Sequence, residues 1–132
     1  LAEFTVLDNV LLPMRRLGAL PENAARQRAG ELLGQFGLHD QGHKRPHQLS
    51  GGQRQRVAIT RALANDPPII LADEPTGNLD SRASANVRQI LHDLTREWGK
   101  TVITVTHDLT FASAADRRIG IVDGLIDPGW RA

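Results

Sequence analysis

The sequence of 132 residues has no cysteine and no apolar run that approaches the length needed to span a membrane. Without cysteine, a disulfide scaffold and a cysteine-ligated zinc site are excluded, and the composition fits a reducing compartment. Residues 1–5 (LAEFT) have neither the basic region nor the apolar core of a secretory signal, and they include no initiator methionine. We therefore expect the sequence to begin inside a longer reading frame and any membrane association to depend on a partner.

Neither sign of charge is in excess, since Lys and Arg together number 16 and Asp and Glu together number 15. This balance argues against a strongly basic protein that binds nucleic acid. The hydrophobic share of 40% and the charged share of 23% are ordinary for one soluble globular domain with a core. His39, His43 and His47 lie in or beside a polar stretch, and we do not expect them to form a metal site.

The chain divides into two segments with different patterns. Residues 1–64 are expected to form helices. The first starts near Thr5, where Thr5-x-x-Asp8 resembles a capping box, with a kink or an end at Pro13. Later helices are expected at about 21–36, 51–64, 81–98 and 109–115, and strands at 69–72, 101–106, 119–122 and 125–126.

The alternation of strands and helices after residue 64 predicts an α/β fold with a parallel sheet and right-handed crossovers. The apolar run 69–72 is expected to be a strand buried on both faces, and Asp123-Gly124 to be the turn of a hairpin. We accordingly predict a helical subdomain over residues 1–64 and the remainder of a parallel-sheet core over residues 65–132.

Residues 49–63 read LSGGQRQRVAITRAL, and Ser50 is expected to cap the helix that this string forms. A helix N-terminus attracts anions, and the glycines Gly51 and Gly52 would let a phosphate approach the backbone closely. Taken alone, Ser50-Gly51-Gly52 reads more readily as a helix cap followed by a flexible turn. The arginines at 54, 56 and 61 give this helix a basic side, which we expect to be exposed to solvent and to form salt bridges rather than to take part in catalysis.

Asp73 and Glu74 directly follow the strand expected at 69–72, and His107 follows the strand expected at 101–106. The carboxyl ends of parallel strands are where ligand sites form in such sheets. Adjacent acids there suit the binding of Mg²⁺ and the activation of water. Without further context, the two acids would be an ordinary acidic turn and the histidine a structural residue. Asp73 lies 73 − 50 = 23 residues after Ser50, and His107 lies 107 − 74 = 33 residues after Glu74. These separations favour a functional role together with the family resemblance that the following strings carry.

The string at 49–63 resembles the signature motif of ATP-binding cassette (ABC) ATPases, and residues 72–80 (ADEPTGNLD) resemble their Walker B motif and D-loop. The second string is typical of a branch that contains lipoprotein-releasing ATPases, macrolide-type exporters and the ATPase partner of the cell-division complex. Residues 9–13 (NVLLP) and 43–46 (HKRP) favour the lipoprotein-releasing type. The resemblance implies a RecA-like P-loop NTPase fold with a helical subdomain that carries the signature.

The resemblance also implies roles for particular residues. Ser50, Gly51, Gly52, Gln53 and Asp80 would contact ATP, Asp73 would handle Mg²⁺, Glu74 would be the catalytic base, and His107 would contact the γ-phosphate. The alternative for Asp80 is that its side chain caps the next helix, and it could do both. Two cassettes would dimerise head to tail, so that each signature faces the ATP of the other subunit. The dimer would lie in the cytoplasm against the inner face of the cell membrane, where it drives an integral membrane permease.

One family motif is missing from these residues. No G-x-x-x-x-G-K-[ST] occurs, and neither lysine, Lys44 or Lys100, follows a glycine-rich loop. The Q-loop glutamine is absent too. We therefore expect a partial cassette whose 132 residues alone neither bind ATP tightly nor hydrolyse it. The alternatives are a catalytically inactive partial cassette that binds a permease or another cassette, and a non-transport ABC protein, for which no long insertion is visible.

Overall fold

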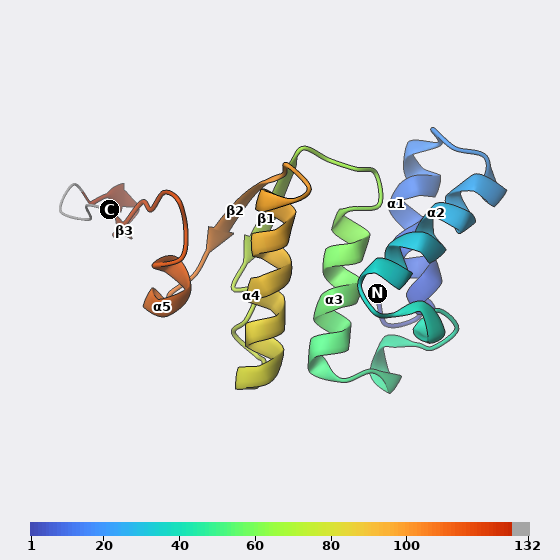
Figure 1. Ribbon diagram of the computed structural model, residues 1–132, viewed down its shortest axis with the longest axis horizontal. Helices are drawn as coiled ribbons and strands as arrows, with labels where there is room; N and C mark the ends of the chain where they lie inside the picture. The colour runs from blue at the N-terminus through green and yellow to red at the C-terminus, as the bar shows by residue number, and fades with distance from the viewer. Residues whose placement is uncertain (128–132) are drawn as a thin grey trace.

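The computed structural model describes residues 1–127, so the last five residues of the predicted core segment 65–132 lie outside the described residues. Figure 1 shows how the helices and strands follow one another along an elongated molecule. In chain order the elements are α1 (Val6–Leu17), α2 (Glu22–Gln35), η1 (His39–Gln41), η2 (Pro46–Gln48), α3 (Gly51–Ala62), β1 (Ile69–Asp73), α4 (Ser81–Arg96), β2 (Thr101–Val105), α5 (Leu109–Ala112), β3 (Ile121–Val122) and β4 (Leu125–Ile126).

The helices begin and end close to where capping residues predict. The Thr5 side chain accepts the N–H of Asp8 at 3.1 Å and caps α1, as expected. Gly37 after α2 and Gly99 after α4 have φ of 65° and 62°, a left-handed conformation that glycine adopts without steric cost. Both helices therefore end within two residues of the predicted ends at 36 and 98.

Pro13 does not end α1, so that part of the prediction is wrong. The helix continues to Leu17, because proline removes one backbone hydrogen bond while the residues on either side, Val10, Leu11 and Met14, remain buried. The polar stretch between α2 and α3 contains two short 3₁₀ helices, η1 and η2.

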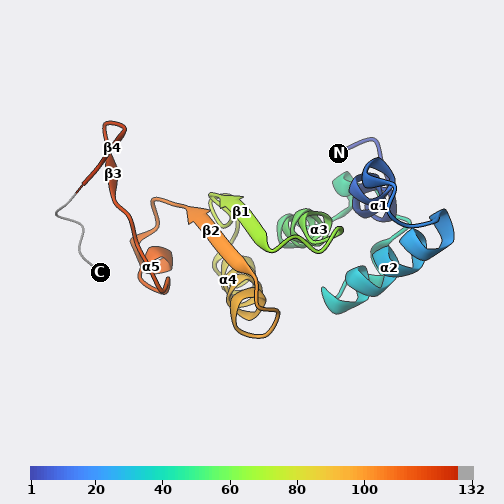
Figure 2. The ribbon, with the colours of Figure 1, turned by 90° about the horizontal axis from the view of Figure 1, so that it is seen from above.

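The parallel sheet consists of β1 and β2, which pair with Leu71 opposite Ile103. The predicted α/β class with a parallel sheet is confirmed. Figure 2 shows α4 beneath this sheet, where Ile70 is 5% exposed. On the opposite face the apolar side chains are 52% to 76% exposed; they are Ile69, Leu71, Ile103 and Val105.

The expectation that β1 is buried on both faces is therefore wrong. Burial depends on what is layered against a strand, and within residues 1–127 α4 covers one face while no element covers the other. Continuous apolarity in a strand identifies a surface that can be buried on both sides. It does not show that both layers are present among the residues described.

The strand predicted near 119–122 does not join the parallel sheet. Residues 121–122 pair with 125–126 in a separate antiparallel hairpin. Asp123 and Gly124 both have positive φ, 49° and 77°, as the tight turn predicted there requires. Closing this short turn orders far fewer residues than a crossover back to β1 or β2 would, so local pairing is favoured.

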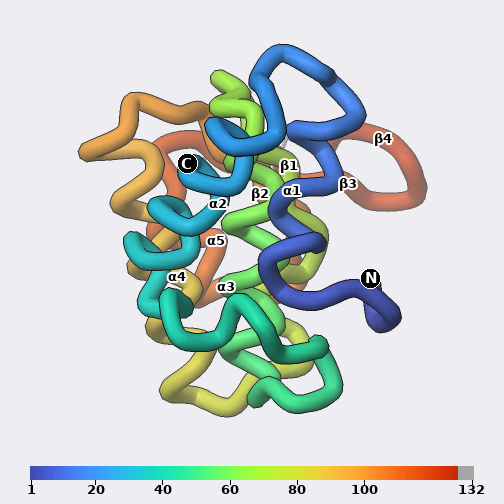
Figure 3. The backbone as a smooth tube through the Cα atoms, turned by 90° about the vertical axis from the view of Figure 1, so that its right-hand side faces the viewer, coloured from blue at the N-terminus to red at the C-terminus, as the bar shows by residue number. Residues whose placement is uncertain are grey.

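The helices α1, α2 and α3 pack together at the other end of the molecule, and Figure 3 views the chain with α1 and α2 nearest the reader. One hydrophobic cluster runs from Val6 in α1 to Leu94 in α4. A hydrogen bond also links α3 to the end of α2: the Arg56 guanidinium donates to the carbonyl of Phe36 at 3.1 Å. This arginine therefore stabilises the packing of the helices. The division into segments 1–64 and 65–132 stays a prediction, because the buried cluster draws on both.

Candidate functional site

The N-terminus of α3 is closed by a reciprocal cap. The Ser50 hydroxyl accepts the N–H of Gln53 at 3.2 Å, and the Gln53 side-chain oxygen accepts the N–H of Ser50 at 2.9 Å. The N–H groups of Gly51 and Gly52 have no acceptor within residues 1–127. With the hydroxyl proton of Ser50, they leave donors at the positive end of the helix, which suits an anion.

A cavity of about 160 Å³ lies against this helix end. It is smaller than the roughly 300–1,000 Å³ of pockets that enclose a small ligand, so it can receive one end of a ligand rather than all of it. Its lining joins α3 to the start of α4 and consists of Ser50, Gly51, Gly52, Gln53, Arg56, Asp80, Arg82, Ala83, Asn86 and Val87. The structure thus brings together all five residues predicted to contact ATP.

Asp80 has a structural role within this cavity. Its side chain accepts the N–H of Ala83 at 2.8 Å and caps α4. This is the capping role predicted as the alternative to contact with ATP. Gln53 is similarly engaged with Ser50. Both residues therefore shape the cavity wall, whereas Ser50, Gly51 and Gly52 supply the donors without partners among the described residues.

Gly52 lies where α3 packs closely against α4. A Cβ atom added to it would lie 3.0 Å from the Cβ of Ala83, a tighter contact than most Cβ atoms make, so one of the two helices would have to shift slightly. This contact brings α3 and α4 together at the cavity. Sequence reasoning assigned the glycine to phosphate approach alone.

The substitution Gly52→Ala is expected to lower the free energy of unfolding by about 1–3 kcal/mol, the usual effect of overpacking. Adding Ala83→Gly to this variant should recover part of the loss, because it removes the opposing methyl group. Chemical denaturation of the wild type, both single variants and the double variant measures the coupling. If the effects of the two substitutions are additive, the contact does not set the helix separation.

Glu74 and His107 meet at the carboxyl ends of β1 and β2. The Glu74 Oε1 atom lies 2.7 Å from Nδ1 of His107 and accepts the backbone N–H of the same residue at 2.9 Å. Its Oε2 atom accepts the hydroxyl of Thr106 at 3.3 Å. The His107 side chain is 85% exposed, so the rest of its ring faces solvent. The parallel strands place these two predicted residues in direct contact.

The environment of Glu74 favours its ionised form. Partial desolvation raises the pKa of this carboxyl, but the hydrogen bonds and the charge of His107, with a further bond from Thr106, hold the pKa below its ordinary value of 4.5. Glu74 also has a φ of 42°, a left-handed conformation that costs about 1–2 kcal/mol for a residue with a side chain. Such strain is concentrated at functional sites.

Asp73 ends β1 beside Glu74, and its exposed carboxylate has no hydrogen-bond or ion-pair partner within the described part of the chain. One free carboxylate fits Mg²⁺, which is commonly held by one or two carboxylates together with phosphates and water. In residues 1–127 no group of three or more His, Cys, Asp or Glu side chains could hold a metal ion by itself. A cation beside Asp73 would therefore need further oxygen ligands, such as phosphate oxygens or water.

The two groups of predicted residues lie on the same side of the elongated molecule but do not share one cavity. Figure 1 shows the starts of α3 and α4 at the end toward which β1 and β2 run. The cavity at α3 includes none of Asp73, Glu74 and His107 in its lining. The arrangement gives two half-sites, one with N–H and hydroxyl donors and one with a carboxylate and an imidazole.

Comparison with known families decides the classification. The family model described as ABC transporter matches residues 1–77, which is more than half of the 132 residues. This chain belongs to the ABC transporter family.

Two relatives illustrate the branch. The chain is 52% identical over 126 residues to the lipoprotein-releasing system ATP-binding protein LolD 1 of Chlorobium chlorochromatii, covering 96% of this chain and 51% of the relative. It is equally 52% identical over 126 residues to the macrolide export ATP-binding/permease protein MacB of Rhodopseudomonas palustris, covering 96% of this chain and 19% of the relative. The predicted branch is confirmed, and the chain spans about half the length of LolD 1.

Solved structures agree with the fold. The ATP-binding cassette MJ0796 of Methanocaldococcus jannaschii, in a dimeric post-hydrolysis state bound to ADP and Pi, superposes with a TM-score of 0.81 at 46% identity. The match covers 96% of this chain and 56% of MJ0796. The RecA-like cassette fold predicted from the motifs is confirmed. No helix of this ABC chain within residues 1–127 has both the length and the apolarity to cross a bilayer.

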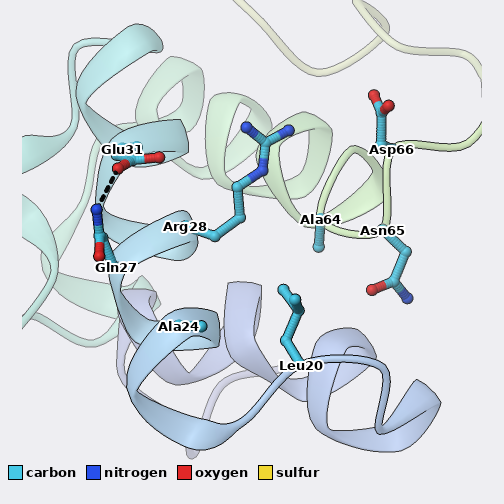
Figure 4. A pocket seen from close by; sticks show the side chains of 8 residues that line it. All are labelled: Leu20, Ala24, Gln27, Arg28, Glu31, Ala64, Asn65 and Asp66. Atoms are coloured by element: carbon cyan, nitrogen blue, oxygen red, sulfur yellow. Dashed lines mark hydrogen bonds between the residues drawn. The ribbon is translucent and has the colours of Figure 1, made fainter.

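A second cavity, of about 420 Å³, lies away from both half-sites of the ABC chain. Figure 4 shows Arg28 projecting from α2 toward the turn after α3, where Asn65 and Asp66 lie, with Leu20 beside Ala24 on the other side. None of the predicted site residues lines it. The smaller cavity at Ser50 is the better site, because donors without partners converge there.

Sequence reasoning missed residues at both half-sites. Arg82 and Asn86 line the cavity from the first and second turns of α4. Thr106 and Asp108 flank His107, and the Thr106 hydroxyl links the Asp108 N–H to Glu74. The TxTHD string at 104–108 places two more polar side chains beside the histidine, which was the available signal.

Proposed function

We propose that this ABC chain supplies both half-sites of an ATP-hydrolysing cassette that energises a membrane permease. The observation that carries the proposal is the 2.7 Å contact between Glu74 and His107 at the end of a parallel sheet. The separate, donor-lined cavity at Ser50 supports it. The transport systems named for the relatives favour lipoprotein release or export as the process energised.

The residues present suit ATP with Mg²⁺. The Ser50 hydroxyl and the N–H groups of Gly51 and Gly52 would donate to phosphate oxygens, and Asp73 would be a carboxylate ligand of Mg²⁺. When bound, Mg-ATP supplies the phosphoryl group to be transferred and a metal charge that neutralises its oxygens. The cavity is too small for a whole nucleotide, which fits a role at the phosphate end.

The second half-site would handle the attacking water. Glu74, kept ionised by its surroundings, orients water and accepts a proton from it. The His107 ring contacts Glu74 through Nδ1, which leaves Nε2 on the exposed side of the ring for a phosphate oxygen. The N–H of His107 holds the carboxylate in place.

A second cassette completes each site in this proposal. The donors at Ser50 and the Glu74–His107 pair lie apart on one chain, so a nucleotide would meet one half-site from each subunit. The related cassette MJ0796 is dimeric in its post-hydrolysis state, which supports the same arrangement here. The assembled dimer would be cytoplasmic and held at the inner face of the membrane by the permease.

The test is phosphate release from Mg-ATP by the full-length protein, meaning the product of the whole reading frame. We expect steady hydrolysis. The 132 residues alone should show no tight ATP binding in a calorimetric titration, because they contain no G-x-x-x-x-G-K-[ST] to hold the β- and γ-phosphates. Micromolar affinity of these residues for ATP would contradict the second expectation. A full-length protein that binds its permease without turnover would favour the inactive interaction module instead.

A further inference from the structure

Asp108 divides its carboxylate between two elements. Its Oδ1 atom accepts the N–H of Phe111 at 3.0 Å and caps α5. Its Oδ2 atom lies 3.2 Å from Nη2 of Arg88, which belongs to α4. Its own N–H donates to the Thr106 hydroxyl at 3.1 Å. The segment that carries His107 is therefore tied to α4 by one ion pair.

Arg88 is held more firmly than an ordinary surface arginine. Its guanidinium carbon lies 5.8 Å from the centroid of the Phe111 ring, at cation–π range. Its Nε atom is buried and has no hydrogen-bond partner within the described residues. A planar guanidinium fixed by an ion pair and an aromatic ring on the same short segment keeps one orientation.

The helix that carries Arg88 also borders the other half-site. The first turn of α4 contacts Gly52 through Ala83, and Arg88 lies further along the same helix. On the other side of the ion pair, the Thr106 hydroxyl reaches Oε2 of Glu74 at 3.3 Å. A continuous series of contacts thus runs from the signature glycine through α4 to the carboxylate that His107 binds.

We propose that Arg88 is a positioning residue for His107. Through Asp108 it fixes the backbone of residues 106–108, so that the N–H and the ring of His107 meet Glu74. The role rests on the proposed function and deepens it, since it names a residue that acts on the catalytic pair without touching the nucleotide. The competing explanation is that Arg88 and Asp108 only hold α5 against α4.

Two variants separate these explanations in the full-length protein. Arg88→Met keeps the aliphatic stem and removes the guanidinium. Asp108→Asn keeps a good helix cap and weakens the ion pair. Arg96→Met is the matched control, because Arg96 lies on the same helix and pairs with Asp116 in an exposed ion pair, with side chains 60% and 71% exposed.

Arg88→Met and Asp108→Asn are each expected to lower kcat for ATP by about tenfold to hundredfold with KM unchanged, as misplaced catalytic groups do. NMR should show faster exchange of the His107 amide proton and shifted ring ¹⁵N signals. The double variant should be no worse than either single one, Arg88→Lys should recover part of kcat, and Arg96→Met should match the wild type.

Wild-type kcat and unchanged His107 signals in Asp108→Asn would overturn the proposal, and so would an equal effect of Arg96→Met. If Arg88→Met fails to fold, Asp108→Asn decides alone, because it retains the cap. A wild type that does not hydrolyse ATP would contradict the proposed function, and the His107 signals would still decide whether Arg88 positions the ring.

Discussion

Replacing Glu74 with glutamine in the full-length protein is expected to reduce ATP hydrolysis by about 10²–10⁴-fold, the usual contribution of a general base. Glutamine has nearly the same shape as glutamate and can still accept the His107 N–H, which lies 2.9 Å from Oε1. It cannot take a proton from water. ATP binding should therefore persist while turnover is lost, and parallel measurements of nucleotide affinity and phosphate release check both.

The matched control is Glu97→Gln, which makes the same chemical change at an exposed residue just after α4. It should hydrolyse ATP at the wild-type rate. If Glu74→Gln also retains wild-type turnover, Glu74 is not the base, and the contact with His107 has a structural role alone.

Replacing Ser50 with aspartate should reduce hydrolysis by at least about 10²-fold, the effect of losing one preorganised donor, to which charge repulsion adds. Aspartate is as good a helix cap as serine, so α3 should keep its start. Its carboxylate would replace a hydroxyl that can donate a hydrogen bond, and the negative charge of the carboxylate would repel a phosphate. Phosphate release measures the effect, and circular dichroism checks that helix content is unchanged.

Ser50→Thr is the conservative control for this position, since it retains both the hydroxyl donor and the cap. It should keep most of the activity. Equal losses in the threonine and aspartate variants would mean that the helix start tolerates no change of shape. In that case the loss of activity in Ser50→Asp would not be due to its negative charge, and it would not support anion binding in the Ser50 cavity.

Local rules predicted the parts of the site that depend on nearby residues. The caps at Ser50 and Asp80 follow from which side chains can accept an N–H three residues on. The meeting of Glu74 and His107 follows from each residue coming directly after a strand, because neighbouring parallel strands end at the same edge.

Features that depend on packing between distant segments could not be predicted. The expectation that β1 is buried on both faces is wrong, because Leu71 is apolar but 76% exposed. The ion pair of Arg88 with Asp108, 20 residues apart, depends on the rotation of α4 over the sheet. The approach of Gly52 to Ala83 depends on how closely two helices pack. Each is a property of tertiary contacts rather than of a local pattern.

Mixing Ser50→Asp and Glu74→Gln subunits tests the central claim most directly, namely that each site is shared between two chains. Each variant alone is expected to be inactive. In a mixed dimer, the Glu74 of the first variant would face the intact Ser50 of the second, which restores one complete site. We predict that co-assembly recovers ATP hydrolysis well above either variant alone. Mixed dimers that form but remain inactive would contradict a composite site.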